Sequence, residues 1–292
     1  MKRLSRREFI RDAGVAGLGV AAASALAQPG AAAAEKEPTV EEVRYELLQP
    51  DEMMARRDKC PVAYIGIGTL EWHDEQNPLG LDALKAHGLV MECARRGGGV
   101  VFPPLFYGES RTEAHVDPTV ADHYGLPKEN FTYFCPYTVA EQWEHYHHLL
   151  IHVFNEMASL GFRFIIVCAG HFPLNDHAKA AMSVFRQTAR RHPTQPVTGY
   201  VFTGCELVLD KFPKAGDHAG PWETSLMMAV NRDSVDLSKV PEERKDSVKE
   251  FSEEYGRKAI DAIAERVLKR VNDMVANPGK YLGHITPMDY GM

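Results

Sequence analysis

Several features are scarce in this sequence, and each scarcity excludes a class of protein. The 292 residues include only 5 cysteines and no CxxC pair, so neither a disulfide scaffold nor a zinc ribbon is expected. Beyond the N-terminus no apolar run reaches the length of a membrane span, and no internal repeat is present, so we expect no stable membrane insertion. Basic residues are outnumbered, with 33 Lys and Arg against 40 Asp and Glu. This acidic balance argues against nucleic acid as a partner.

The first 34 residues have the organisation of a signal peptide. Arg6 and Arg7 precede Phe9, and an apolar run rich in Ala and Gly follows before small-residue cleavage sites. The paired arginines resemble a twin-arginine signal, which the Tat export machinery reads and which exports folded proteins. A membrane anchor is the weaker alternative, because the run is only about 15 residues long. We therefore predict a signal peptide over residues 1–34 and an exported protein, periplasmic or otherwise extracytoplasmic.

The remaining residues, 35–292, are predicted to form a single α/β domain. Apolar runs rich in β-branched residues predict strands, and the stretches between them predict helices. The predicted strands cover residues 62–68, 100–105, 162–168 and 196–203. The predicted helices cover residues 82–96, 138–160, 175–191, 223–230 and 242–275. Because strands separated by helices favour parallel pairing, the pattern predicts a three-layer α/β/α sandwich with a mostly parallel sheet.

A first cluster of polar residues follows the first predicted strand. Glu71 and His73 lie two residues apart, so on extended backbone they point to the same side, and Asp82 returns after a loop with Pro and Gly. Carboxylates and an imidazole at the end of a strand are what a hydrolytic metal site needs. A polar loop with solvated acids and a hydrogen-bonded histidine is the alternative.

Two further clusters are expected at the same edge of the sheet. His171 directly follows the most apolar strand, and Glu223 opens a helix a few residues after His218. Taken singly, His171 could be a loop histidine, and Glu223 a carboxylate favoured by the helix dipole. Because parallel strands bring their carboxyl ends to one edge, three such clusters together favour a shared metal site.

In this order the clusters resemble the motifs of the creatininase-type (creatinine amidohydrolase) metal hydrolases. The first motif, Gly-Ser-x-Glu-x-His-Gly-x-His-Leu-Pro-x-x-x-Asp, has Glu71, His73 and Asp82 at the matching spacing. The second, Asn-Gly-His, is matched by residues 169–171, and the third, His-Ala-Gly-x-x-Glu-Thr-Ser, by residues 218–225. The resemblance implies a Rossmann-like α/β/α fold, a two-metal centre and a homo-oligomer, for which a hexamer is one arrangement.

Two departures from the family motifs bear on the site. The second histidine of the first motif is replaced, since His73 is followed by Asp-Glu-Gln. In creatininase a glutamate two residues after the second-motif histidine binds metal, and here that position is Pro173. This difference argues against creatinine as the substrate. Another carboxylate must then complete the second metal site, for which Glu223 is the candidate and Asp176 and His177 are the fallbacks.

Residues and resemblance together predict a metal-dependent hydrolase. Five side chains are predicted to ligate two divalent ions: Asp82 as the bridge, Glu71 and His171 on one ion, and His73 and Glu223 on the other. Nitrogen and oxygen ligands without thiolate suit Zn²⁺ or Mn²⁺. Two such ions about 3.5–4 Å apart can hold a bridging hydroxide that attacks a carbonyl. His218 is the predicted catalytic residue, which passes the proton to the leaving group; orienting a ligand carboxylate is its alternative role.

The leading interpretation is hydrolysis of a C–N bond in a cyclic or other small amide. Ring opening of an oxidised cyclitol or sugar diketone by C–C hydrolysis is an alternative, because residues 75–77 carry groups that suit a polyhydroxylated ligand. An exported metal- or solute-binding protein without enzymatic activity is the other alternative.

The remaining predictions concern histidines and aromatic residues outside the motifs. Three histidines share a face of the predicted helix 138–160 and offer a second candidate metal site, although solvent or a subunit contact is more typical there: His145, His148 and His152. Three residues of the long loop 106–137 are candidate substrate contacts: His115, Asp117 and His123. Trp72 and Trp222 adjoin proposed ligands and could stack on a ring substrate or pack in the core. Cys168 is expected to pack within its strand.

Overall fold

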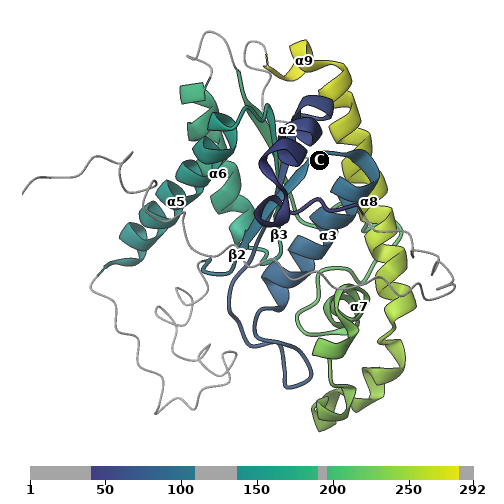
Figure 1. Ribbon diagram of the computed structural model, residues 1–292. Helices are drawn as coiled ribbons and strands as arrows, with labels where there is room; N and C mark the ends of the chain where they lie inside the picture. The colour runs from purple at the N-terminus through teal and green to yellow at the C-terminus, as the bar shows by residue number, and fades with distance from the viewer. Residues whose placement is uncertain (1–40, 109–136, 190–195, 283–292) are drawn as a thin grey trace, which may run out of the picture. The chain divides into compact units, whose positions relative to one another are not determined.

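The computed structural model describes residues 41–108, 137–189 and 196–282 (Figure 1). The chain divides into two compact units, Met1–Val40 and Glu41–Met292, and all described residues belong to the second. The predicted signal peptide and the three candidate substrate contacts of the long loop, His115, Asp117 and His123, lie outside the described residues. The predicted domain over residues 35–292 stays a prediction. No helix within the described ranges combines the length and the apolar character that crossing a membrane requires.

The sheet consists of four parallel strands in the order β2-β1-β3-β4. The strands are β1 (Val62–Ile67), β2 (Val100–Leu105), β3 (Phe164–Ala169) and β4 (Thr198–Phe202). Ala63 pairs with Val100 on one side and with Ile165 on the other, so β1 and β3 form the centre of the sheet. Every residue of these two central strands is buried, as the apolar runs in the sequence predict.

Helices connect the strands and cover both faces of the sheet. The longer helices are α2 (Pro50–Lys59), α3 (Leu81–Gly97), α5 (Val139–Ser159), α6 (Leu174–Ala189), α7 (Pro221–Val230) and α8 (Glu253–Ala276). The short segments are η1 (Tyr45–Leu47), η4 (Arg232–Ser234), η5 (Leu237–Lys239), η6 (Glu242–Glu250) and α9 (Pro278–Leu282).

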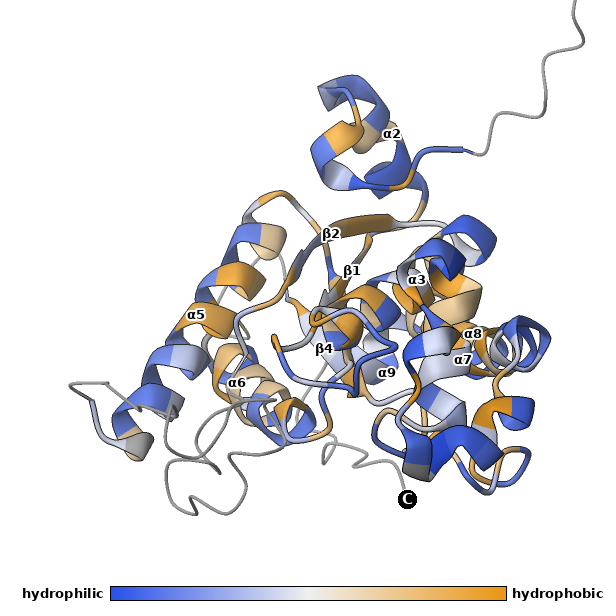
Figure 2. Cartoon of the chain, turned by 90° about the horizontal axis from the view of Figure 1, so that it is seen from below, coloured by the Kyte–Doolittle hydropathy of each residue, from blue (hydrophilic) through white to orange (hydrophobic). Residues whose placement is uncertain are grey.

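Alternation along the central strands divides the core into two layers. Val62 and Tyr64 pack in a cluster with residues of α3, α7 and α8, whereas Ala63 and Ile65 pack with residues of α5 and α6. Figure 1 shows α5 and α6 on one side of the sheet and α3 and α8 on the other. The strands are largely hydrophobic in Figure 2. The predicted three-layer α/β/α sandwich with a parallel sheet is therefore confirmed.

The predicted single helix over residues 242–275 is wrong in its first part. Residues Glu242–Glu250 form the 3₁₀ segment η6, and Phe251 is buried in extended conformation with φ −80° and ψ 120°. Ser252 then caps α8, because its hydroxyl accepts a hydrogen bond from the backbone N–H of Tyr255 at 3.2 Å. Burial of Phe251 and the serine cap together end one helical segment and begin the next. Helix α7 begins two residues before its predicted start, at Pro221, a residue that suits the first turn of a helix.

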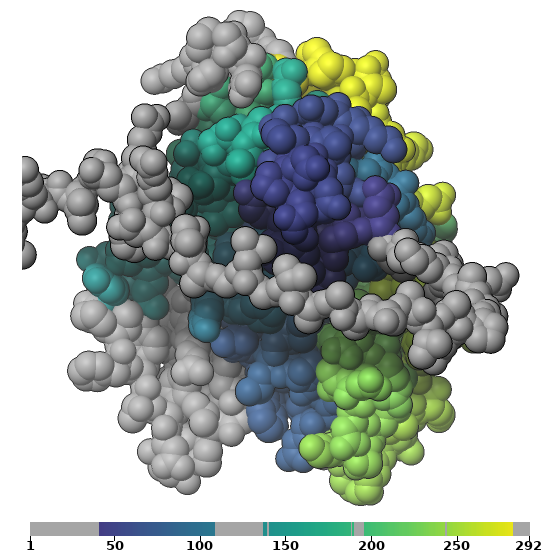
Figure 3. Space-filling model, in the orientation of Figure 1, coloured from purple at the N-terminus to yellow at the C-terminus, as the bar shows by residue number. Residues whose placement is uncertain are grey.

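Helix α2 has no counterpart among the predicted elements. None of its residues is buried, so the apolar periodicity that reveals the other helices is absent. Pro50 and a capping box between Gln49 and Glu52 start the helix instead. In Figure 3 this segment, in purple to dark blue, lies on the surface.

Candidate metal centre

The five predicted metal ligands come from four segments at the carboxyl edge of the sheet. Glu71 and His73 lie in the loop after β1, and His171 lies two residues after β3. Asp82 is in the first turn of α3 and Glu223 in the first turn of α7. The backbone N–H of Glu71 donates to the carbonyl oxygen of Leu79 at 3.1 Å and closes the loop that carries His73.

Two glycines allow α3 to bring Asp82 close to the strand ends. A Cβ atom at Gly68 would lie 2.2 Å from the backbone nitrogen of Ala83, and one at Gly170 would lie 2.0 Å from the carbonyl oxygen of Asp82. A side chain at either position would push the helix away from the sheet. The glycines that follow β1 and β3 thus let the first turn of α3 reach the site.

The first group of ligands comprises Glu71, Asp82 and His171. Nδ1 of His171 lies 2.9 Å from Oε2 of Glu71 and 3.4 Å from Oδ2 of Asp82. Both oxygens are buried and accept no well-directed hydrogen bond from the residues that the structure describes. Their ligand atoms all lie within 4.8 Å of one another, so they can hold one ion.

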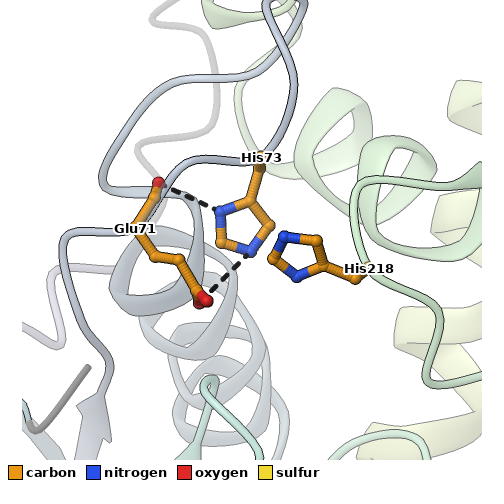
Figure 4. Close-up of side chains that lie close together, drawn as sticks. All are labelled: Glu71, His73 and His218. Carbon is orange, nitrogen blue, oxygen red and sulfur yellow. Dashed lines mark hydrogen bonds and ion pairs between the residues drawn. The ribbon is translucent and has the colours of Figure 1, made fainter. Parts of the chain in front are cut away.

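The second group shares Asp82 and adds His73 and Glu223. Nε2 of His73 lies 3.4 Å from Oδ1 of Asp82 and 3.4 Å from Oε2 of Glu223. Nδ1 of His73 faces the backbone carbonyl oxygen of Glu71 at 3.2 Å (Figure 4). Because a carbonyl oxygen only accepts, Nδ1 carries the proton in the neutral ring, which leaves the lone pair of Nε2 for an ion held between this nitrogen and the carboxylates.

The donor atoms fit divalent transition metals. Ligand atoms at 2.0–2.1 Å from a tetrahedral ion are about 3.4 Å apart. Three nitrogen–oxygen distances in the two groups are 3.4 Å, those from His73 to Asp82 and Glu223 and that from His171 to Asp82. Asp82 directs one carboxylate oxygen to each group, as a bridging ligand does. Imidazole and carboxylate donors without thiolate suit Zn²⁺ or Mn²⁺.

Without an ion, the carboxylates and histidines of the centre alter one another's pKa. Burial alone would raise the pKa of Asp82, but Lys85, His171 and His73 hold the pKa of Asp82 well below its usual value. Burial alone would lower the pKa of His171, yet Asp82 and Glu71 raise it to about 10. The pKa of His73 is likewise raised by Asp82 and Glu223 against the effect of its burial. These shifts show that the carboxylates favour positively charged groups beside them, as they would favour a metal cation.

Lys85 belongs to the centre and was missed in the sequence. Its ammonium contacts both Asp82, at 3.0 Å from Oδ1, and Oε1 of Glu223. Burial alone would lower the pKa of Lys85, but these two carboxylates raise it above its usual value. The sequence did contain a signal for the role of Lys85. Asp82 and Lys85 are three residues apart on a helix, and Lys85 lies among the buried residues Ala83, Ala86 and Leu89.

His218 lies at the exposed edge of the centre. Its ring contacts that of His73 with centroids 4.4 Å apart and the ring planes tilted by 31°, and a ring nitrogen lies within 4.8 Å of the ligand atoms of Glu71 and His73 (Figure 4). Nε2 of His218 lies 2.9 Å from the carbonyl oxygen of Trp72. Nε2 must therefore be the protonated nitrogen in the neutral ring, which leaves Nδ1 free to accept a proton.

The turn before α7 holds Glu223 in place. Ala219 adopts a left-handed backbone conformation with φ 55°, and its N–H donates to Oε2 of Glu223 at 3.0 Å. Its carbonyl oxygen accepts from Nε2 of Gln76 and from Oγ1 of Thr224, each at 3.1 Å. Asn77 is also buried and donates to Thr224. Gln76 and Asn77 therefore hold the turn and do not line the cavity beside the centre.

A cavity of about 560 Å³ adjoins the ligands, within the range of small-molecule sites. Besides the ligands, its lining includes Trp72, Phe172, Thr203 and Arg244. Asp74 has a left-handed backbone with φ 53°, and its Oδ2 lies 3.1 Å from Nη1 of Arg244.

Arg244 connects η6 with both loops beside the cavity. Nη1 of Arg244 also donates to the carbonyl oxygen of His218 at 2.9 Å. In Figure 3 the blue loop after β1 and the lime segment that contains η6 lie side by side. The contacts of Arg244 thus join η6 to two other segments, the loop after β1 and the turn before α7.

Other predicted ligands lie apart from the centre. Asp176 is exposed, and His177 faces His147 with 3.0 Å between Nδ1 and Nε2. Neither fallback residue belongs to a group of potential metal ligands found among the described residues, whereas Glu223 lies next to His73. Three histidines of α5 are exposed, and no group of metal ligands found among the described residues includes them: His145, His148 and His152.

The two tryptophans differ in their surroundings. Both tryptophans line the cavity, but Trp222 is only 3% exposed and packs on Phe212 and Tyr255 with ring centroids 5.7 and 6.4 Å away. Trp222 therefore packs mainly in the hydrophobic core. Cys168 is fully buried within β3, as expected. The four cysteines in the described ranges are all free.

Comparisons with known proteins bear on the family and the fold. A family model described as creatininase (creatinine amidohydrolase) matches residues 46–275. No curated protein sequence matches the chain. A manganese form of creatininase is 19% identical with a TM-score of 0.62, covering 80% of this chain and 99% of that chain. A Zn–Zn form of a creatininase mutant is 18% identical with a TM-score of 0.61 and the same coverage. A creatininase mutant complexed with creatine is 19% identical with a TM-score of 0.61, again covering 80% and 99%.

These matches confirm the family resemblance and the predicted class of enzyme. At such low identity the solved structures show the shared fold. The family model extends from before β1 to the end of α8 and includes every ligand of the centre. The chain belongs to the creatininase (creatinine amidohydrolase) family.

Proposed function

We propose that this protein is a metal-dependent hydrolase that cleaves a C–N bond in a cyclic or other small amide. The observation that carries the proposal is the pair of ligand groups that share Asp82 beside a cavity. Two divalent ions, Zn²⁺ or Mn²⁺, suit these ligands, in line with the manganese and Zn–Zn forms of creatininase. When bound, such ions activate water and polarise the scissile carbonyl.

The residues of the chain orient the ligands and move the proton. The backbone carbonyl of Glu71 directs Nε2 of His73 to the centre, and the Ala219 N–H does the same for Glu223. The Trp72 carbonyl keeps the proton of neutral His218 on Nε2, so Nδ1 can take a proton from the nucleophile and deliver it to the leaving nitrogen. Its exposed position at the edge of the centre suits such a transfer.

The cavity supports a small substrate. Its volume of about 560 Å³ and its mixed aromatic and polar lining suit a ring-sized amide. Pro173, at the position of a metal-binding glutamate in creatininase, favours a substrate other than creatinine. The alternative of C–C hydrolysis loses its supporting observation, because none of residues 75–77 lines the cavity.

Metal analysis combined with a substrate screen tests the proposal. Wild type and Asp82→Ala are compared for bound Zn²⁺ and Mn²⁺ and for turnover of cyclic amides, lactams and cyclic diketones. We expect metal and amide turnover in the wild type and neither in the variant. Bound metal without turnover of any compound would favour a binding protein, and turnover of diketones alone would favour C–C hydrolysis.

A second comparison separates proton transfer from metal binding. His218→Gln should lower turnover by about 10²–10⁴-fold while the metal content stays that of the wild type. Equal turnover would reject proton transfer by His218. Loss of metal would assign it a ligand role.

We also propose that the protein is exported through the Tat machinery and acts outside the cytoplasm as a homo-oligomer, with a hexamer as one arrangement. The support for export is the Arg6-Arg7 pair before an apolar run. Replacing both arginines by lysine should retain the protein in the cytoplasmic fraction, and unchanged export would reject this route. Light scattering of the purified protein measures the oligomer, and a monomeric mass would reject that part.

A further inference from the structure

Lys85 is a cation placed inside a centre whose other side chains are metal ligands. Only 8% of its side chain is exposed, and its ammonium lies between Oδ1 of Asp82 and Oε1 of Glu223. Lysine is almost never buried to this degree without charged partners, and here both partners are predicted metal ligands. Its role in the centre therefore requires an explanation.

The ammonium affects the two ligand groups differently. Oδ1 of Asp82 lies 3.0 Å from Nζ of Lys85 and 3.4 Å from Nε2 of His73, so the ammonium and the second group share this oxygen. Glu223, the other carboxylate of the second group, also contacts Lys85. The first group uses Oδ2 of Asp82 instead, with Glu71 and His171. Lys85 thus contacts both carboxylates of one group and shares no oxygen with the other.

The charge balance of the centre also disfavours a second ion. The three ligand carboxylates, Glu71, Asp82 and Glu223, carry three negative charges. One divalent ion together with the ammonium of Lys85 balances them. A second divalent ion adds two positive charges close to that ammonium, and repulsion between cations is strong in a buried site. The first ion therefore brings the net charge of the carboxylates and the ammonium to zero, and the second ion makes it positive.

We propose that Lys85 is a built-in cation that makes the His73–Asp82–Glu223 site the weaker of two metal sites. The protein then holds one ion firmly in the Glu71–Asp82–His171 site and takes a second only at higher metal concentration. Without the second ion, Lys85 keeps Asp82 and Glu223 in position. This inference rests on the proposed function, because it presupposes a metal centre.

Metal titration of variants tests this role directly. The full-length protein is stripped with a chelator and titrated with Zn²⁺, by calorimetry for affinity and by elemental analysis after dialysis for stoichiometry. The wild type should bind in two steps with affinities that differ by at least about 100-fold. Lys85→Met, which keeps the aliphatic stem and removes the charge, should tighten the second step by at least about tenfold.

Two further variants accompany the titration. Lys85→Gln removes the same charge with a polar end group, and it should tighten the second step as Lys85→Met does; circular dichroism shows which variants are folded. Lys258→Met is the matched control, because Lys258 is exposed on α8 and pairs only with Glu254 at 2.7 Å in the described structure. The control should reproduce both wild-type steps.

The outcomes separate this inference from the proposed function. Two equally tight ions in the wild type, or a second step unchanged in both folded Lys85 variants, would overturn the role of Lys85 and leave the hydrolase proposal intact. A wild type that binds no Zn²⁺ would reject the metal centre and with it both proposals.

Discussion

Raising the pH of the metal-free protein from 6.5 to about 10 should lower its stability through His171. The pKa of His171 is raised from 6.5 to about 10, because the facing carboxylates of Asp82 and Glu71 outweigh the effect of its burial. In this pH range the folded protein still holds the proton that the unfolded chain has lost. The free energy of unfolding therefore falls as the pH rises.

The size of the effect follows from the two pKa values. The contribution is present in full below pH 6.5, declines above it and is lost as the pH passes about 10. At 1.36 kcal/mol per pKa unit, the difference corresponds to a change of about 5 kcal/mol. Only 13% of the His171 side chain is exposed, so solvent screens the interaction little.

Urea unfolding in the presence of a chelator measures this change. Wild type and His171→Asn are compared at intervals between pH 6.5 and 10, and groups outside the centre, which titrate in both proteins, largely cancel in the difference. The stability advantage of the wild type should shrink by several kcal/mol across the range. With saturating Zn²⁺ this decline should disappear, because the ion binds the neutral imidazole. Parallel curves for the two metal-free proteins would refute the reasoning.

Three further substitutions test the surroundings of the centre. Gly170→Ala should lower the free energy of unfolding by at least about 3 kcal/mol in urea titrations, because the added Cβ would lie 2.0 Å from the Asp82 carbonyl oxygen. Gly279→Ala is the control, because a Cβ at that position meets nothing within 4 Å. Arg244→Met breaks contacts to Asp74 and to the loop of His218, so turnover should fall by about tenfold at constant metal content. An unchanged rate would show that these contacts do not position the loops for turnover. Ser252→Ala removes the cap of α8 and should cost about 1 kcal/mol in the same unfolding assay, whereas no loss would show that the cap adds little.

The sequence by itself determined the layers of the fold and the candidate ligands that the structure brings together. The apolar runs of β1 and β3 are long enough to identify buried parallel strands, and the four strands agree with the prediction to within about two residues at each end. Glu71, His73 and His171 could be predicted because each follows a strand, and the carboxyl ends of parallel strands meet at one edge. These features depend on residues that are close in the chain, so local sequence patterns reveal them.

Contacts between distant segments could be decided only by the tertiary structure. Lys85 and Glu223 are 138 positions apart, and their pairing depends on how α3 packs against α7. Likewise, Asp74 and Arg244 meet across the cavity, and the Trp72 carbonyl selects the protonated nitrogen of His218. The break before α8 required burial of Phe251, which a helical pattern does not reveal. Sequence spacing shows which face a side chain occupies, but the partner on that face follows from packing of the whole domain.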